Sequence, residues 1–126
     1  MKRQQVSAWI DAYERAWRAE GTDALAEIFT EDAVYSQGPY LEPHHGLKEI
    51  AVMWEETRDG PGEVFRMTHE VIAVDGDMAV ARVEVWYGEP VRHEFRDLWV
   101  MSFAEDGRCR AYEEWPFAPG QPISAV

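Results

Sequence analysis

One acidic residue, Asp97, lies in a stretch where every second residue is apolar. Alternate side chains of an extended chain point to the same face, so Asp97 shares its face with Phe95, Trp99 and Met101. A carboxyl group in such surroundings is either paired or held protonated by desolvation, which raises its pKa. Asp97 is therefore the first candidate catalytic residue, a neutral acid that donates a hydrogen bond to a ligand oxygen. The alternative is a surface aspartate on an irregular strand.

Two further residues could move a proton. His69 alternates with Phe65 and Met67, and its intrinsic pKa suits a general base. A histidine on an apolar face is, however, more often a hydrogen-bonded core residue. Glu113 alternates with Trp115 on the last predicted strand, where it could act as a base or pair with an arginine at the rim.

The histidine and cysteine pattern does not predict a metal site. His44 and His45 are adjacent, so both would bind one ion only with difficulty, and no third ligand follows at a metal-site spacing. We expect them to join a loop to a helix. Cys109 has no recognisable histidine partner and is interpreted as a small apolar core residue. Neither a metal nor a cofactor is expected.

The elements that position these residues follow from the periodicity of the chain. A helix of period 3.6 is predicted from 6 to about 20, because apolar residues recur at Val6, Trp9, Ile10, Tyr13, Ala16 and Trp17. Further elements are a helix at 25–29, an extended piece at 33–35, a helix from 47 to about 58, and strands at about 63–74, 78–87, 91–104 and 108–117. Helices followed by a strand meander predict an α+β fold, with three N-terminal helices packed in an antiparallel sheet.

Composition limits the class of protein. The 126 residues are enough for one domain, predicted at 1–118 and followed by a loose tail at 119–126. A net charge of -12 without Lys/Arg clusters disfavours nucleic acids and anionic membranes as partners. A single cysteine permits no disulfide within the chain, and no signal peptide or membrane span is expected. The sequence thus predicts a soluble cytoplasmic protein.

Several segments resemble a known superfamily. The stretch 13–29, the runs EDAVY at 31–35 and EPHHGL at 42–47, and the strand ends at 106–108 and 113–115 are similar to the small NTF2-like proteins, among them ketosteroid isomerases and SnoaL-like cyclases. The resemblance covers nearly the whole chain. It implies a strongly bent sheet that forms a cone around the first helix, with the ligand site inside.

The resemblance also assigns roles. Tyr13 matches the tyrosine with which ketosteroid isomerases stabilise an oxyanion, although it could equally be a core tyrosine. Asp97 matches an inward-pointing aspartate of the family. Gln37 stands where the isomerases have their catalytic base, and an amide cannot take up a proton. Double-bond isomerisation by the family route is therefore in doubt. An Arg-x-Asp arrangement like that of epoxide hydrolases of this fold is not found, since Arg96 and Asp97 are adjacent.

Combining strand faces with the implied cone gives a predicted pocket. Asp97, Tyr13 and His69 are the candidate catalytic residues. The candidate ligand-binding residues are Tyr35, Gln37, Trp54, Met67, Trp99, Met101, Glu113 and Trp115. A slip of one residue in any strand would turn the wrong side chains inward.

The opposite face of the sheet is predicted to form a homodimer. Its apolar residues would be Trp86, Leu98, Val100 and Tyr112, with a polar rim of Arg82, Glu84, Arg96 and Glu114. NTF2-like proteins are commonly dimers through this surface, as the resemblance implies.

Two classes of function remain open. One is a cofactor-independent isomerase, cyclase or dehydratase that transfers protons on a small apolar, oxygenated molecule of cyclic, polyketide or steroid type. The other is a non-catalytic module that binds such a molecule without turnover. Asp97 within an aromatic face favours the enzyme, and Gln37 at the position of the base favours the binding module.

Overall fold

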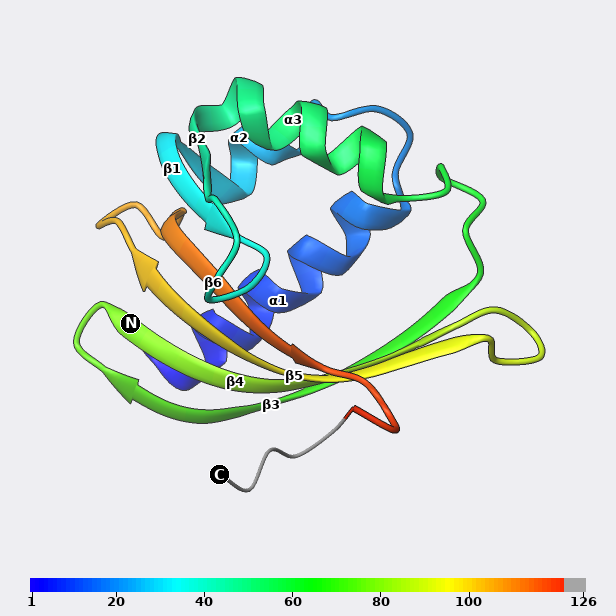
Figure 1. The fold of residues 1–126 in the computed structure, drawn as a ribbon. Coiled ribbons are helices and arrows are strands. Elements are labelled where there is room, and N and C mark those ends of the chain that lie inside the picture. Colours follow the sequence, from blue (N-terminus) through cyan, green and yellow to red (C-terminus); the bar gives the residue numbers. More distant parts are fainter. Residues whose placement is uncertain (122–126) are drawn as a thin grey trace.

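The sheet of this protein curls around its first helix (Figure 1). The computed structural model describes residues 1–121. Its elements are α1 (Arg3–Arg18), α2 (Leu25–Ile28), β1 (Phe29–Ser36), β2 (His44–His45), α3 (Gly46–Thr57), β3 (Phe65–Asp75), β4 (Met78–Tyr87), β5 (His93–Phe103) and β6 (Cys109–Phe117). Helices α2 and α3 lie on the far side of α1 from strands β3 to β5 (Figure 1). The predicted α+β class, with helices inside a strongly bent sheet, is confirmed.

The six strands lie in the order β2-β1-β6-β5-β4-β3. Strands β3 to β6 form the antiparallel meander that the period-2 patterns predict. β1 is longer than the predicted piece at 33–35 and pairs in parallel with β6. The two-residue strand β2 was not predicted; it pairs with β1 through Val34 to His45 and Tyr35 to His44.

Helix α1 forms the centre of the core. Its six predicted stripe residues are all buried: Val6, Trp9, Ile10, Tyr13, Ala16 and Trp17. The Trp9 indole also donates a hydrogen bond to the Ile28 carbonyl, 2.8 Å away, which fixes α2 against α1. One face of α1 thus packs against the sheet, and Trp9 connects α1 to α2.

Arg58 closes the C-terminal end of α1. A helix leaves its last carbonyls without backbone donors. The Arg58 guanidinium, in a residue only 5% exposed, donates to the carbonyls of Ala16, Trp17, Ala19 and Gly21. Glu55, one turn earlier on α3, pairs with the same guanidinium at 2.6 Å. This buried cation therefore joins the ends of α1 and α3.

A β-bulge in β6 changes which side chains face the core. Ser102 of β5 pairs with Ala111, but Phe103 pairs with Cys109, so Arg110 has no partner residue opposite it. Cys109 and Tyr112 are consequently both buried although they are three residues apart. A regular alternation from Cys109 would turn the odd-numbered residues of β6 inward. From Tyr112 onward the even-numbered residues point inward instead.

The end of the chain is described only in part. Residues 118–121 form a turn in which the backbone N–H of Gln121 donates to the Ala118 carbonyl at 3.3 Å. Residues 122–126, most of the predicted tail at 119–126, lie outside the described residues. None of the helices in residues 1–121 is long and apolar enough to cross a membrane.

Candidate functional site

A cavity of about 230 Å³ lies between α1, α3 and the concave face of the sheet. Its fifteen lining residues are Tyr13, Trp17, Tyr35, Gln37, Met53, Thr57, Phe65, Met67, Val85, Tyr87, Phe95, Asp97, Trp99, Glu114 and Pro116. Most of the wall is apolar, and its polar groups are a few tyrosines, one threonine, one amide and two carboxyl groups. Such a wall suits a small, largely apolar ligand that is oriented by few hydrogen bonds.

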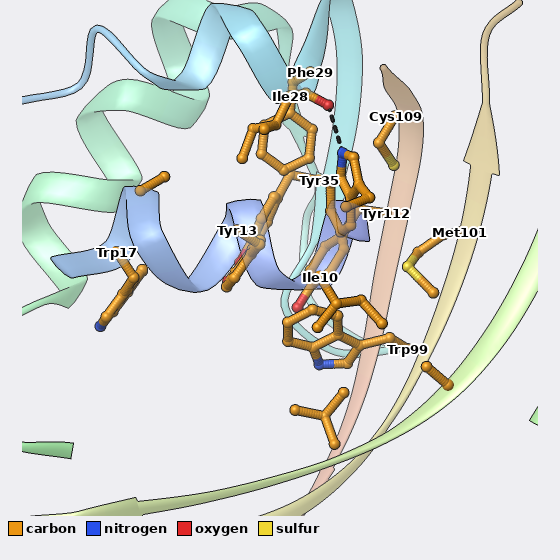
Figure 2. Packing of buried hydrophobic residues seen from close by; sticks show 14 of the residues in the cluster. Ile10, Tyr13, Trp17, Ile28, Phe29, Tyr35, Trp99, Met101, Cys109 and Tyr112 are labelled. Atoms are coloured by element: carbon orange, nitrogen blue, oxygen red, sulfur yellow. Dashed lines mark hydrogen bonds between the residues drawn. The ribbon is translucent and has the colours of Figure 1, made fainter. Parts of the chain in front are cut away.

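Tyr13 of α1 is the centre of the aromatic wall. Its ring lies 4.6 Å from that of Trp99 and 5.0 Å from that of Trp54, measured between centroids, and is stacked on Tyr112 at 5.7 Å. Figure 2 shows Tyr13, Tyr35, Tyr112 and Trp99 gathered beside α1 and the inner strands. Aromatic pairs at such separations stabilise the packing beyond the area that they bury.

The tyrosine hydroxyl groups of this wall bond to one another. Tyr13 Oη and Tyr35 Oη are 2.6 Å apart. Burial, more than any other cause, raises the pKa of both hydroxyls well above the ordinary tyrosine value. Both side chains therefore stay protonated at physiological pH and act as hydrogen-bond donors rather than as bases.

Two carboxyl groups, from Asp97 on β5 and Glu114 on β6, meet at the cavity wall. Asp97 is 5% exposed, and its Oδ2 accepts a long hydrogen bond from Trp99 Nε1 at 3.4 Å. No nitrogen or hydroxyl of residues 1–121 donates to Asp97 Oδ1. The Glu114 carboxyl lines the same cavity wall as the Asp97 carboxyl, and each is a neighbour that shifts the pKa of the other.

Burial raises the pKa of both carboxyl groups. It raises the pKa of Glu114 well above the ordinary value, and the neighbouring Asp97 carboxyl raises it further. Burial also raises the pKa of Asp97, in the direction expected from its apolar neighbours, although the neighbouring Glu114 and Trp99 side chains oppose the shift. Like charges in one site cannot both ionise cheaply. We therefore expect the pair to retain one proton, with Glu114 as the acid and Asp97 as the carboxylate.

Gln37 contributes the only amide side chain among the lining residues. It follows β1 directly, and β2 lies antiparallel to β1, so His44 comes beside it. The Gln37 Oε1 and His44 Nε2 atoms are 3.1 Å apart. His44 therefore belongs to the outer support of the site, whereas the sequence predicted only a loop-to-helix role for it.

The structure places the predicted site residues in three groups. Six of them line the cavity: Tyr13, Tyr35, Gln37, Met67, Asp97 and Trp99. Trp54 and Met101 are fully buried behind this wall and do not line it. His69 lies outside the cavity, where its Nε2 is 2.7 Å from Ser7 Oγ and its Nδ1 is 3.9 Å from Asp11 Oδ1.

The face assignment of β6 is wrong beyond the bulge. Glu113 and Trp115 point to the outer face, where Trp115 is 39% exposed and its indole donates to Glu113 Oε1 at 2.6 Å. Glu114 and Tyr112, predicted on the outer face, point inward instead, and Tyr112 is 1% exposed. The extra residue Arg110 shifts the alternation by one, which exchanges the two faces.

Sequence reasoning missed Glu114, although one pattern could have indicated it. Cys109 and Tyr112 are both apolar and three residues apart, an odd spacing that fits neither phase of a regular strand and is typical of a bulge. Cys109 is buried as expected, and burial raises the pKa of its thiol to about 12. No group of three or more His, Cys, Asp or Glu side chains within residues 1–121 is arranged to hold a metal ion.

An open sheet that curves around a central helix, with a cavity inside the curve, defines the NTF2-like class of α+β proteins. The profile of the SnoaL-like domain family matches residues 9–112, so the chain belongs to this family. No curated protein matches the chain.

Solved structures share the fold at low sequence identity. The epoxide hydrolase/cyclase-like enzyme SalBIII, described as acting in pyran ring formation in the polyether salinomycin, has a TM-score of 0.73 and 14% identity over 90% of this chain and 92% of that one. A putative ketosteroid isomerase from Kribbella flavida scores 0.70 at 17% identity, over 98% and 82% of the two chains. An NTF-2 like protein of unknown function from Burkholderia xenovorans scores 0.71 at 16% identity, over 98% and 91%.

Proposed function

We propose that this protein is a cofactor-independent acid–base enzyme acting on a small apolar molecule that carries oxygen. The observation that carries the proposal is that two carboxyl groups, Asp97 and Glu114, line the wall of one aromatic cavity, where burial raises the pKa of both. One member of such a pair can accept a proton while the other donates one. Positioned acid and base groups of this kind contribute typically 10²- to 10⁴-fold to a rate.

The pair can catalyse a dehydration with the proton count unchanged. Asp97 takes the proton from the carbon beside a carbonyl, and that electron pair forms the new double bond as the carbon–oxygen bond of the leaving hydroxyl breaks. Glu114 gives its proton to this hydroxyl, which leaves as water. Ring closure of an epoxy alcohol follows the same logic: Asp97 takes the proton of the attacking hydroxyl and Glu114 protonates the epoxide oxygen. Cyclase-like and isomerase-like neighbours of the same fold accord with such chemistry.

The size of the cavity limits the substrate. A cavity of 150 Å³ is known to hold benzene, and pockets for drug-sized ligands begin near 300 Å³. The 230 Å³ here therefore suits one substituted ring or a short chain that closes to one, rather than the four fused rings of a steroid.

The test uses two minimal substrates and a matched control. 3-Hydroxycyclohexanone, whose dehydration gives an enone visible by ultraviolet absorption, and a short epoxy alcohol that closes to a cyclic ether would be assayed with wild-type protein, Asp97→Asn and Glu114→Gln. Glu113→Gln is the control, since Glu113 lies on the outer face. We expect turnover that both cavity variants lower at least about 100-fold. Turnover equal in the control and cavity variants would refute the acid–base role.

A second candidate function is binding without turnover. It is favoured by Gln37, which lines the cavity where a base would be needed for the isomerase route and cannot take up a proton. Under this alternative, cyclohexanone and cyclohexanol would quench the fluorescence of the cavity residues Trp17 and Trp99, with no product formed from either test substrate.

The outer face of the sheet supports a homodimer. Leu98 of β5 is opposite Trp115 of β6, and these residues are 41% and 39% exposed. Phe117, 55% exposed, extends this outer patch. Exposed neighbouring apolar side chains on one sheet face are typical of an interface. Leu98→Asp should yield monomers by light scattering, whereas Tyr40→Ser, which removes a fully exposed loop aromatic, should leave a dimer. A monomeric wild type at micromolar concentration would refute the dimer.

A further inference from the structure

We infer that Gln37 is the hydrogen-bond donor that recognises the acceptor oxygen of the ligand, and that His44 is the residue that positions it. This inference rests on the proposed function and deepens it: the ligand class becomes a small ring bearing a carbonyl or ether oxygen. The carboxyl pair acts on the reacting atoms, and the Gln37 amide fixes the orientation of the ligand relative to that pair.

The direction of the Gln37 amide follows from its contact with His44. A carbonyl oxygen can only accept, so the 3.1 Å contact requires His44 to donate its Nε2–H to Gln37 Oε1. The opposite end of the amide, the NH₂ group, has no hydrogen-bond acceptor among residues 1–121, whereas the side chain lines the cavity. Two N–H donors are therefore offered to a ligand.

The local backbone explains why His44 can hold this amide. β1 and β2 pair through Tyr35 and His44, and the chain between them turns back within 37–43. His45, the next residue, directs its backbone N–H to Glu49 Oε1 at 2.8 Å and is the N-cap residue of α3. Its side chain is exposed, while that of His44 is half-buried beside Gln37. The two adjacent histidines thus have different environments.

The amide also complements the remaining polar groups of the wall. Tyr13 Oη and Tyr35 Oη share one hydrogen bond at 2.6 Å, so one of the two hydroxyl protons remains free to donate. The Gln37 NH₂ group adds two N–H donors to the cavity wall, and the contact of its Oε1 with His44 fixes their direction. A ligand that supplies an acceptor oxygen to this group therefore gains affinity over one that does not.

The test compares two ligands of similar shape. Cyclohexanone carries an acceptor oxygen, whereas methylenecyclohexane has a CH₂ group in its place. Their dissociation constants would be measured by quenching of tryptophan fluorescence for wild type, Gln37→Leu, His44→Ala and the matched control His45→Ala. A ketone is more strongly hydrated than an alkene, so the ratio of the two constants in one protein is not informative. The change of that ratio between proteins isolates the hydrogen bond.

We expect Gln37→Leu to raise the ratio of the cyclohexanone dissociation constant to the methylenecyclohexane dissociation constant by about fivefold to tenfold. This factor is the worth of one net hydrogen bond. His44→Ala should shift it in the same direction by a smaller factor, because the amide then loses its orientation, and His45→Ala should leave it unchanged. A purely structural role of His44 would weaken both ligands equally and leave the ratio constant.

The outcomes separate this inference from the proposed function. If wild type binds both ligands but Gln37→Leu keeps the wild-type ratio, the donor role is refuted and the acid–base proposal survives. If His44→Ala and His45→Ala have equal ratios, the positioning role of His44 is refuted. If neither ligand binds to wild type while the protein is folded by its melting curve, the cavity is not a ligand site and the proposed function is refuted as well.

Discussion

Replacing Glu114 by glutamine should make the protein more stable at neutral pH, although it removes a carboxyl group from the cavity wall. In the unfolded chain a glutamate loses its proton near pH 4.3. In the folded protein burial and the Asp97 charge hold the Glu114 proton to much higher pH. Between these two pKa values the folded state carries one proton more than the unfolded state, so the stability of the wild type falls as the pH rises.

The magnitude follows from one retained proton. The free energy of unfolding of the wild type should fall by about 1.4 kcal/mol for each pH unit inside this window, until the folded-state pKa of Glu114 is reached. Glutamine does not titrate, so the free energy of unfolding of Glu114→Gln does not fall in this way. The difference in stability between the variant and wild type therefore grows with the same slope. Below about pH 4 both chains are neutral at this position, and we expect a difference of no more than about 1 kcal/mol, one hydrogen bond.

The assay is urea unfolding at pH 5, 6 and 7, followed by tryptophan fluorescence, with Glu113→Gln as the matched control. Glu113 lies one residue away on the outer face, where its carboxylate accepts a hydrogen bond from Trp115. Its variant should keep the pH dependence of the wild type. If the free energy of unfolding depends on pH in the same way in Glu114→Gln and in wild type, Glu114 is not protonated in the folded protein. The assignment of Glu114 as acid and Asp97 as base would then be refuted as well.

Three further predictions concern the scaffold. Arg58→Met should lower the free energy of unfolding by about 3 kcal/mol or more, because it removes a donor from four main-chain carbonyls, of which the contacts to Ala16 and Trp17 are buried. The exposed Arg15→Met is the control, and equal loss in both would contradict the capping role. His69→Ala and Ser7→Ala should each cost about 1 kcal/mol and together cost no more than one of them, since both remove the same contact, and neither should change ligand affinity. The Cys109 thiol should resist alkylation at neutral pH until the protein unfolds, because burial raises its pKa to about 12, and rapid labelling of folded protein would disprove this.

The helical half of the fold was predictable because its periodicity depends on local sequence. All six apolar stripe residues of α1 are buried, from Val6 to Trp17. Asp97 could also be predicted to face the interior, because β5 alternates regularly along its whole length. Regular elements preserve the relation between spacing and face, so a residue within them can be assigned from its neighbours alone.

The remaining parts of the site depend on contacts between distant segments. The bulge at Arg110 exists because β6 must pair with β5 on one edge and with β1 on the other, and the registers of both pairings shift there. The spacing of Cys109 and Tyr112 indicates a bulge but does not fix the residue at which the register shifts, so Glu113 was placed where Glu114 lies. The contact of Gln37 with His44 likewise depends on a two-residue strand too short to have a periodicity. The polar chemistry of the site is thus set by the irregular positions.

The absence of a cation from the cavity wall supports the proposed acid–base role of the carboxyl pair. None of the fifteen lining residues within the described chain is Lys, Arg or His. A nearby guanidinium would stabilise both carboxylates in their ionised form, and the pair would then hold no proton to donate. The basic residues instead pair elsewhere, as Arg58 does with Glu55 and Arg82 with Glu70. In a chain of net charge -12, keeping Asp97 and Glu114 apart from every cation lowers stability but retains one proton where a ligand oxygen would meet it.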